Sequence, residues 1–375
     1  MSLVDGYDGR VTLGELVERW SPYADDLYLH DAGGPGECLV RRGQLLVGPD
    51  GVEPVVERLR RWVDTVESDD ATSTATLRLR SSEHRNCIDI AREVGAAPNH
   101  VHLGSPVLFG TPVLFGTGAE ARPAPSVPEP EDTVWDPPVR VGLLDTGLDP
   151  HPWFADRVWF EPVRERLDAD DDAGQDRQAG HGTFVAGILL QHAPGVVVRA
   201  ERALSSLGFT DDLTVARGLR ALRTGAAARG ERIDVVVLTA GCHTADDTCP
   251  PVLATELSDF SATVAAAGNL SSERPFWPAA LPEVLAVAAT GRDGATAGFS
   301  NTGPWVDAAA PGEAVASSHV RMIAGSAERD YGFARWSGTS FAAPAVAAEV
   351  ARGLHEGGTP AHALAVARRR YPFGR

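Results

Sequence analysis

The chain has 375 residues, of which 43% are hydrophobic and 23% charged, a composition typical of a globular protein with a sizeable core. Its formal net charge of −17 would repel a phosphate backbone, so nucleic acid is not expected as a partner. Because no run of 18 apolar residues occurs, neither a membrane-spanning helix nor a membrane partner is expected.

The first six residues have neither the basic nor the apolar region of a Sec signal peptide. A cytoplasmic location is therefore expected, with export by another route as the alternative. The chain has four cysteines, which are expected to be reduced thiols in the cytoplasm. If the protein were exported, Cys242 and Cys249 could close a small loop through a disulfide.

Residues 1–118 are predicted to form a small N-terminal α/β domain. Its elements, in chain order, are a helix opened by a capping box of Thr12 and Glu15, a strand at 44–47, a helix capped by Asp50 whose apolar face runs from Val52 to Val66, a strand at 74–80, a helix at 87–94 ended by Gly95, and a strand at 100–103. This order favours one small sheet with helices on one face.

A short repeat and a proline-rich segment follow this domain. The sequence Pro-Val-Leu-Phe-Gly-Thr occupies residues 106–111 and again 112–117, which indicates an apolar strand or hairpin. Residues 119–138 hold six prolines among several acidic residues, which is typical of an extended linker. The linker separates the N-terminal domain from a second domain at residues 139–375.

This second domain alternates apolar strands with helices. The predicted strands lie at 139–144, 196–200, 233–238, 263–266 and 284–288, and the predicted helices at 182–190, 213–228 and 252–260. Apolar strands separated by helices favour an α/β fold with a mostly parallel sheet that is covered on both faces. Ligands of such sheets bind at the carboxyl ends of the strands.

Four short segments of the second domain carry residue types suited to acyl transfer. Asp145 ends an apolar strand, His181 begins a helix, Asn269 follows a strand, and Ser340 lies in the turn that leads into another helix. An imidazole can remove the proton of a serine hydroxyl, while a buried carboxylate orients the imidazole. An asparagine amide and the backbone N–H of Ser340 can donate to the oxyanion of a tetrahedral intermediate.

Each segment alone is common in proteins. Asp145-Thr146-Gly147 also matches the motif of aspartic proteases, but that mechanism needs a second Asp-Thr/Ser-Gly, and the sequence has none. The four segments together favour a catalytic triad of Asp145, His181 and Ser340 with Asn269 as oxyanion donor.

The segments resemble those of the subtilisin-like serine peptidases, or subtilases, in which the triad residues follow one another as Asp, His and Ser. The resemblance covers about residues 139–355 and extends to the connecting segments 235–241, 276–279, 285–289, 299–303 and 310–312. It implies a serine endopeptidase with a subtilisin-like three-layer domain, acting on a peptide or protein substrate.

The resemblance also implies a set of substrate-binding residues. Two segments are expected to wall the S1 pocket and a third to pair with the substrate backbone; they are Thr239, Ala240 and Gly241, then Ala266, Ala267 and Gly268, and finally Gly208, Phe209 and Thr210. Phe276 lies where broad-specificity subtilases have glycine at the pocket floor, so a small P1 residue such as Ala, Gly or Ser is expected.

No cofactor is expected to be required, and no residue is assigned as a metal ligand. The acidic segment Asp168-Ala169-Asp170-Asp171-Asp172 is interpreted as a solvated loop. The alternative is a Ca²⁺ site, because hard oxygen ligands cluster there and subtilases often bind calcium.

Many subtilases carry a small α/β prodomain that assists folding and blocks the cleft, and the order of elements in residues 40–104 resembles one. The repeat at 106–117 could then lie in the cleft as a substrate mimic. Two further hypotheses remain: a catalytically silent or autoinhibited module with the subtilase fold, and a processing protease dedicated to one precursor.

Overall fold

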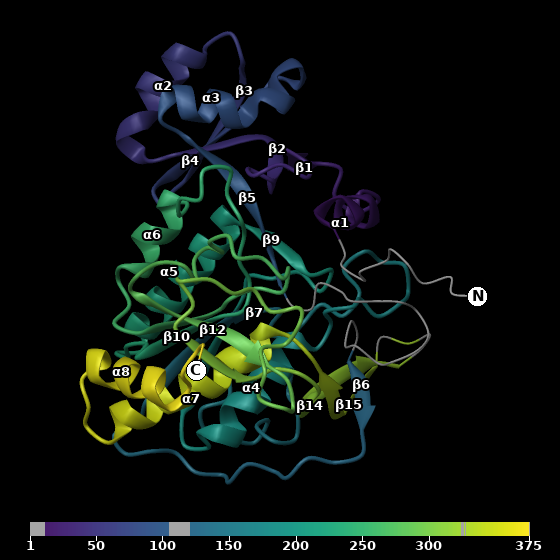
Figure 1. Ribbon diagram of the computed structural model, residues 1–375, viewed down its shortest axis with the longest axis vertical. Helices are drawn as coiled ribbons and strands as arrows, with labels where there is room; N and C mark the ends of the chain where they lie inside the picture. Colours follow the sequence, from purple (N-terminus) through teal and green to yellow (C-terminus); the bar gives the residue numbers. More distant parts are fainter. Residues whose placement is uncertain (1–11, 105–120, 324–325, 327, 375) are drawn as a thin grey trace.

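The computed structural model describes residues 12–104, 121–323, 326 and 328–374. The repeat at 106–117 lies outside the described residues. Figure 1 shows the N-terminal part, in purple and blue, stacked on the C-terminal part, in teal, green and yellow. Among the described residues, no helix is both long and apolar enough to cross a membrane.

The C-terminal part is built on a six-stranded sheet with the order β13-β12-β11-β10-β7-β8. Every pairing within it is parallel. The strands are β7 (Arg140–Asp145), β8 (Val197–Arg202), β10 (Val235–Leu238), β11 (Thr263–Ala266), β12 (Val284–Thr290) and β13 (Ala308–Pro311). The predicted mostly parallel sheet is confirmed, and β13 is a strand that the sequence patterns did not reveal.

Helices cover both faces of this sheet, because alternate strand residues are apolar in both directions. Val235 and Val237 of β10 pack with α4 (His181–His192) and α7 (Thr339–His355), while Val236 and Leu238 pack with α5 (Asp212–Ala228) and α6 (Pro251–Leu257). Helix α8 (Pro360–Arg370) packs on α7. The predicted three-layer α/β architecture is confirmed.

The N-terminal part is an antiparallel sheet with three helices packed against it. Its strands are β1 (Leu27–His30), β2 (Cys38–Val47), β3 (Val63–Asp69), β4 (Thr74–Leu79) and β5 (Ala97–Leu103), and its helices are α1 (Leu13–Trp20), α2 (Val52–Leu59) and α3 (Cys87–Val94). The capping box of Thr12 and Glu15 and the end of α3 at left-handed Gly95 are as predicted.

The helix predicted to run from Val52 to Val66 is wrong in its second half. Helix α2 ends at Leu59, and residues Val63–Asp69 form β3 beside β4. An apolar spacing of three residues fits a helix face, but Val66 is 41% exposed on an edge strand and takes no part in the core. Asp50 does not cap α2, because the N-cap is Gly51 and no side chain bonds there.

One strand joins the two parts. β5 of the N-terminal part pairs with β9 (Phe209–Asp211) of the C-terminal part, with Val101 opposite Asp211 and Leu103 opposite Phe209. In Figure 1, β5 descends from the N-terminal part to lie beside β9. The N-terminal sheet, in the order β3-β4-β2-β5-β9, therefore extends into the C-terminal part.

The segment after residue 120 packs against the C-terminal part. β6 (Arg122–Ala124) pairs with β15 (Arg329–Trp336), which forms a hairpin with β14 (Val315–Met322). The guanidinium of Arg157 then donates to the carbonyl oxygens of Pro130 and Glu131. These contacts fix the path of residues 121–131 along the C-terminal part.

Candidate active site

The carboxyl end of β7 and the start of α4 bring Asp145 and His181 together. The two side chains are fully buried, and the distance from His181 Nδ1 to Asp145 Oδ1 is 2.7 Å. The backbone N–H of Thr146 also donates to Asp145 Oδ1, at 2.7 Å. Such a carboxylate fixes both the orientation of the imidazole ring and the tautomer with its proton on Nδ1.

Thr239 provides a hydrogen bond to the second oxygen of this carboxylate. Its hydroxyl donates to Asp145 Oδ2 at 2.6 Å. The sequence placed Thr239 only in a wall of the S1 pocket, since its position after β10 says nothing of where the hydroxyl points. The structure adds a contact with the predicted triad.

Ser340 is the second residue of α7, and its hydroxyl makes no hydrogen bond to His181 in this structure. Ser340 Oγ donates to the carbonyl oxygen of Thr239 at 2.9 Å. His181 Nε2 is buried and has no hydrogen-bond partner among the described residues. The ring of Phe341, the next residue, lies 5.2 Å from that of His181, so the start of α7 reaches the imidazole. Rotation about the Cα–Cβ bond of Ser340 redirects its hydroxyl.

Thr339 ties Asn269 to the turn that carries Ser340. Asn269 Oδ1 accepts from the backbone N–H of Thr339 at 2.8 Å and from its hydroxyl at 3.1 Å. Thr339 Oγ1 in turn accepts from the backbone N–H of Gly268 at 3.1 Å. These bonds hold Asn269 beside the helix start where Ser340 lies, as an oxyanion donor requires.

The residues predicted to bind a substrate backbone bind the chain itself. Leu103 and Gly241 exchange two backbone hydrogen bonds, at 2.7 and 3.1 Å, and the N–H of Gly104 donates to the carbonyl oxygen of Gly208 at 3.0 Å. Phe209 and Thr210 pair with β5 as part of β9. β5 therefore lies between Gly208–Thr210, which was predicted to pair with a substrate backbone, and Gly241, which was predicted to wall the S1 pocket.

Phe276 lies against the two predicted walls of the S1 pocket. A Cβ atom added to Gly241 would lie 2.5 Å from Phe276 Cε1, and one added to Gly268 would lie 2.9 Å from Phe276 Cδ1. The ring is 2% exposed. Ala266 and Ala267 are buried as well, while Ala240 is half-buried. An aromatic ring thus occupies space between the walls.

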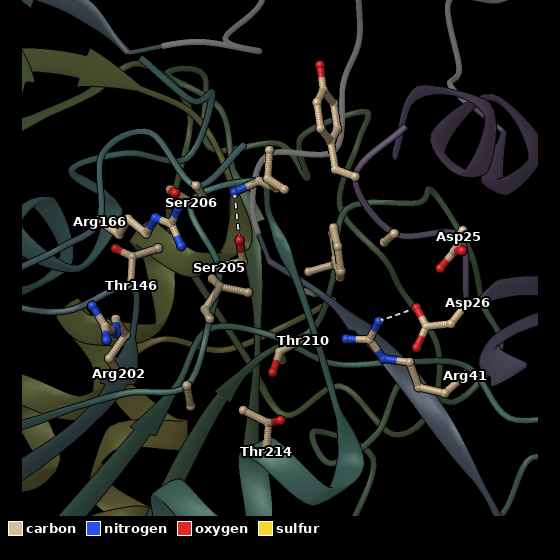
Figure 2. Close-up of a pocket in the computed structure, with 17 residues that line it drawn as sticks. Asp25, Asp26, Arg41, Thr146, Arg166, Arg202, Ser205, Ser206, Thr210 and Thr214 are labelled. Atoms are coloured by element: carbon tan, nitrogen blue, oxygen red, sulfur yellow. Dashed lines mark hydrogen bonds and ion pairs between the residues drawn. The ribbon is translucent and has the colours of Figure 1, made fainter. Parts of the chain in front are cut away.

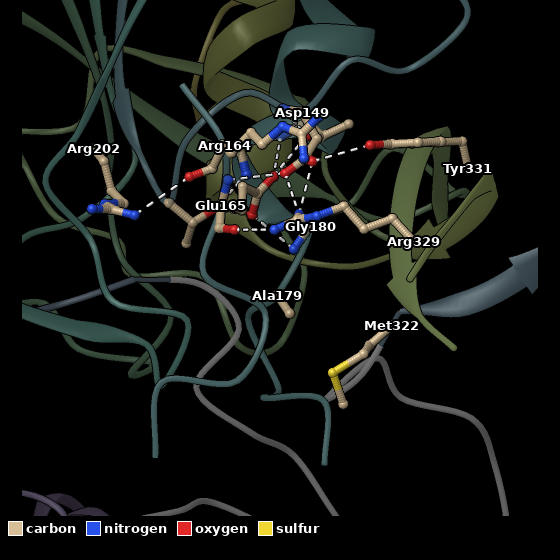
Figure 3. A network of polar contacts seen from close by, with 12 residues as sticks. Asp149, Arg164, Glu165, Ala179, Gly180, Arg202, Met322, Arg329 and Tyr331 are labelled. Carbon is tan, nitrogen blue, oxygen red and sulfur yellow. Dashed lines mark hydrogen bonds and ion pairs between the residues drawn. The ribbon is translucent and has the colours of Figure 1, made fainter. Parts of the chain in front are cut away.

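A buried polar network below the site was not foreseen from the sequence (Figure 3). Glu165 Oε2 accepts from the Thr146 hydroxyl at 2.5 Å and from the Gly180 N–H at 2.8 Å, and Oε1 accepts from Thr183. Burial raises the pKa of Glu165 to about 7. The network ties the loop after Asp145 to the residue before His181, so it holds these two segments in position.

Arg329 links the same network to the β14–β15 hairpin. It donates to both carboxylate oxygens of Asp149 at 2.8 Å and to the carbonyl oxygen of Glu165 at 2.6 Å. Tyr331 donates to Asp149 Oδ1 at 3.2 Å, as Figure 3 shows. The hairpin therefore stabilises the loops that follow Asp145 and precede His181.

The acidic loop contributes a group of carboxylates. Oxygens of Asp168, Asp170 and Asp176 lie within 4.8 Å of one another. Asp171 instead pairs with Arg166, and Asp172 accepts from the backbone of Gly174. Burial and the neighbouring carboxylates of Asp168 and Asp172 raise the pKa of Asp170, although a hydrogen bond from the Asp172 backbone N–H opposes them. A set of oxygen donors alone suits a hard cation such as Ca²⁺.

A pocket of about 540 Å³ opens beside Thr146, at the junction of the two parts (Figure 2). Two of its three arginines have carboxylate partners, while the third, Arg202, donates to the carbonyl oxygen of Arg164 at 3.4 Å. Arg41 pairs with Asp26 at 2.8 Å and with Asp211 at 2.9 Å, and Arg166 pairs with Asp171. The pocket therefore offers no unpaired cluster of positive charge to an anionic ligand.

All four cysteines are free thiols, so the alternative disulfide between Cys242 and Cys249 is not formed. Burial raises the pKa of the Cys249 thiol to about 12 and holds that of Cys242 well above its usual value. Both thiols are therefore neutral at physiological pH.

Comparison with known proteins places this geometry in context. A family model described as "Subtilase family" matches residues 137–362. A thermophilic serine proteinase of Bacillus sp. (strain AK1) is 32% identical over 219 residues, which are 55% of this chain and 50% of that protein. Thermitase of Thermoactinomyces vulgaris is 30% identical over 219 residues, which are 56% of this chain and 72% of that protein.

The likeness in fold extends further than the family match. The structure of fervidolysin from Fervidobacterium pennivorans, described as a keratinolytic enzyme related to subtilisin, has a TM-score of 0.57 and 18% identity. The matched region covers 86% of this chain and 56% of the fervidolysin chain, so part of residues 1–136 has a counterpart in fervidolysin as well. The chain spans about half the length of the Bacillus AK1 relative.

Proposed function

The chain belongs to the subtilase family, and from this premise we propose that it is a serine endopeptidase with Ser340 as nucleophile, His181 as general base and Asp145 as the orienting carboxylate. The observation that carries the proposal is the fully buried pair of His181 Nδ1 and Asp145 Oδ1 at 2.7 Å, beside the start of α7. The name of one relative adds support, because it is called a thermophilic serine proteinase.

In the proposed reaction, the Ser340 hydroxyl turns from Thr239 towards His181 Nε2, which has no other partner among the described residues. Nε2 takes the proton as Oγ attacks the scissile carbonyl carbon, and Asp145 stabilises the imidazolium that forms. The Asn269 amide and the N–H of Ser340 donate to the oxyanion, each such donor contributing about 3 kcal/mol. His181 then returns the proton to the leaving amine, and water releases the acyl group.

A fluorophosphonate probe tests this function on the full-length protein, because it reacts only with an activated serine. We expect one labelled site, which is lost in Ser340→Ala and kept in Ser337→Ala. Ser337 is the control because its hydroxyl accepts from the Ala314 N–H and has no part in the proposed triad. Equal labelling of both variants, or none in the wild-type chain after prolonged incubation, would favour the rival hypothesis of a catalytically silent module.

We propose in addition that the N-terminal part inhibits this activity. β5 occupies both backbone edges, at Gly241 and at Gly208–Thr210, so a substrate cannot pair there while β5 remains. The hydroxyl of Ser340 also donates to the carbonyl oxygen of Thr239 and not to His181. Cleavage between residues 105 and 138, detected by mass spectrometry as a new N-terminus, should coincide with the appearance of peptidase activity.

The position of Phe276 supports a preference for small P1 residues. Its ring lies against Gly241 and Gly268, the two walls between which a large P1 side chain would insert. Such a narrow pocket also fits a protease dedicated to one precursor. Cleavage sites mapped on a peptide library should show Ala, Gly or Ser at P1, and activity on unfolded casein should be weak.

We also propose that Ca²⁺ binds the carboxylates of Asp168, Asp170 and Asp176, where it would relieve the repulsion among them and brace the loop after Arg166. No catalytic step depends on this ion. A cytoplasmic location is the remaining proposal, supported by four free thiols, and cell fractionation tests it.

A further inference from the structure

The side chain of His102 in β5 lies against the carboxylate of Asp212 in the C-terminal part, and we call the place that it occupies a subsite. His102 and Asp212 are both fully buried, and His102 Nε2 lies 2.7 Å from Asp212 Oδ1. Asp212 is the first residue of α5, where the positive end of the helix dipole favours its charge. Cys242, the residue after Gly241, closes the subsite, with ligand atoms of the three side chains within 4.8 Å of one another.

Every hydrogen bond to the Asp212 side chain among the described residues comes from β5. The backbone N–H of His100 donates to Oδ2 at 2.7 Å, His100 Nδ1 lies 2.9 Å from Oδ2, and His102 Nε2 lies 2.7 Å from Oδ1. Burial opposes ionisation, but the charge and hydrogen bonds of the two histidines outweigh it and lower the pKa of Asp212. When β5 leaves, this carboxylate has lost all three donors.

The antiparallel register locates this subsite relative to the nucleophile. Leu103 pairs with Gly241, so a substrate in the same register has its second residue beyond the Leu103 position opposite Thr239. The carbonyl of Thr239 is 2.9 Å from Ser340 Oγ, so that substrate residue is P1. Counting back, the position of Leu103 is P3 and the position of His102 is P4.

We propose that Asp212 makes this subsite selective for histidine at P4. The inference rests on the proposed peptidase function and names its substrate class: extended peptides with His at P4 and a free backbone N–H at P6, which takes the place of the His100 N–H. A P4 leucine would leave Asp212 Oδ1 without the donor that His102 supplies, and sites built to hydrogen-bond a substrate group reject analogues that lack it.

A bound metal ion is a poorer explanation of the same residues. Zinc ligands lie about 2 Å from the ion at tetrahedral angles, which separates two ligand atoms by more than about 3 Å. The 2.7 Å between His102 Nε2 and Asp212 Oδ1 is the length of a direct hydrogen bond. The subsite is therefore described as a donor–acceptor pair.

The experiment compares two peptides with the full-length protein after incubation, its active fraction titrated with the fluorophosphonate probe. Both have Ala at P1, Gly at P2 and Leu at P3, extend to P6, and differ only in His or Leu at P4. We expect kcat/KM to be about tenfold to a hundredfold higher for the His peptide at pH 7.5, since one hydrogen bond to a buried charged acceptor is at stake. The ratio should approach one in Asp212→Asn.

Asp259→Asn is the matched control, because it removes the same charge from a partly exposed position that pairs with Arg223. Its His-to-Leu ratio should equal that of the wild-type chain. Probe labelling with equal kcat/KM for the two wild-type peptides would overturn the P4 inference and leave the peptidase proposal standing, whether or not Asp212→Asn folds. A wild-type chain that neither labels nor cleaves would overturn both.

Discussion

Removing the hydroxyl of Thr239 should slow the chemical step. Thr239 Oγ1 donates to Asp145 Oδ2 at 2.6 Å inside a fully buried site, so Thr239→Val leaves that carboxylate oxygen without this donor while preserving the side-chain shape. A hydrogen bond to a charged group contributes about 1.5–3 kcal/mol. If all of it acts on the transition state, kcat falls by about tenfold to a hundredfold.

Steady-state hydrolysis of one peptide with Ala at P1, normalised to the probe-titrated active fraction, measures this effect. KM should change little, because the contact acts on Asp145 rather than on the substrate. Thr239→Ser, which keeps a hydroxyl, is the control and should retain most of the rate. A raised KM with an unchanged kcat in Thr239→Val would mean that Thr239 only walls the S1 pocket, and the reasoning would be refuted.

Burial raises the pKa of Glu165 from 4.5 to about 7, so the stability that its protonated form contributes is present below pH 4.5 and is lost as the pH rises through 7. Glu165→Gln should therefore flatten the fall of Tm between pH 5 and 8, and an unchanged slope would contradict this. Phe276→Gly should add Leu and Phe to the P1 residues accepted, at a cost of about 3–5 kcal/mol in stability, as P1 mapping and denaturant unfolding would show. Calcium should raise Tm in the wild-type chain and in Asp171→Asn but not in Asp170→Asn, and a Tm insensitive to EDTA would exclude the ion. Ser340→Ala should remain a single intact chain during incubation, whereas the wild-type chain should shorten at 105–138; shortening of both at equal rates would point to a contaminating protease.

Elements built from local patterns could be predicted from the sequence. The strands at β7, β10 and β11 are continuous apolar runs, and α3 ends where Gly95 adopts a left-handed conformation. The fold class followed from their alternation with helices. β3 could not be predicted, because Val63 and Val66 fit a helix face equally well and only pairing with β4 decides between the two.

The candidate site divides in the same way. Asp145, His181, Asn269 and Ser340 lie in short motifs that can be read one at a time. The roles of Thr239 and Asp212 could not be, because each depends on where a side chain points across the fold: Thr239 lies 94 residues from Asp145, and His102 lies 110 residues from Asp212. The role of Glu165 could not be predicted either, since nothing in its neighbouring sequence marks it as a partner of Thr146 and Gly180.

The rotamer of Ser340 depends on the whole assembly as well. Its hydroxyl bonds to the Thr239 carbonyl while β5 lies between the substrate-binding edges. Sequence motifs identify the residue that carries the hydroxyl, but they contain no information on which acceptor it bonds to while β5 is in place.

The most direct test of the proposed triad is kcat for Asp145→Asn, measured on probe-titrated protein with a peptide that has His at P4 and Ala at P1. An asparagine keeps the shape of the buried side chain but presents the wrong partner to His181 Nδ1. We expect kcat to fall by about 10⁴ with little change in KM, as the replacement of a triad carboxylate by its amide does in a serine protease of another fold. A kcat within tenfold of the wild-type value would contradict it.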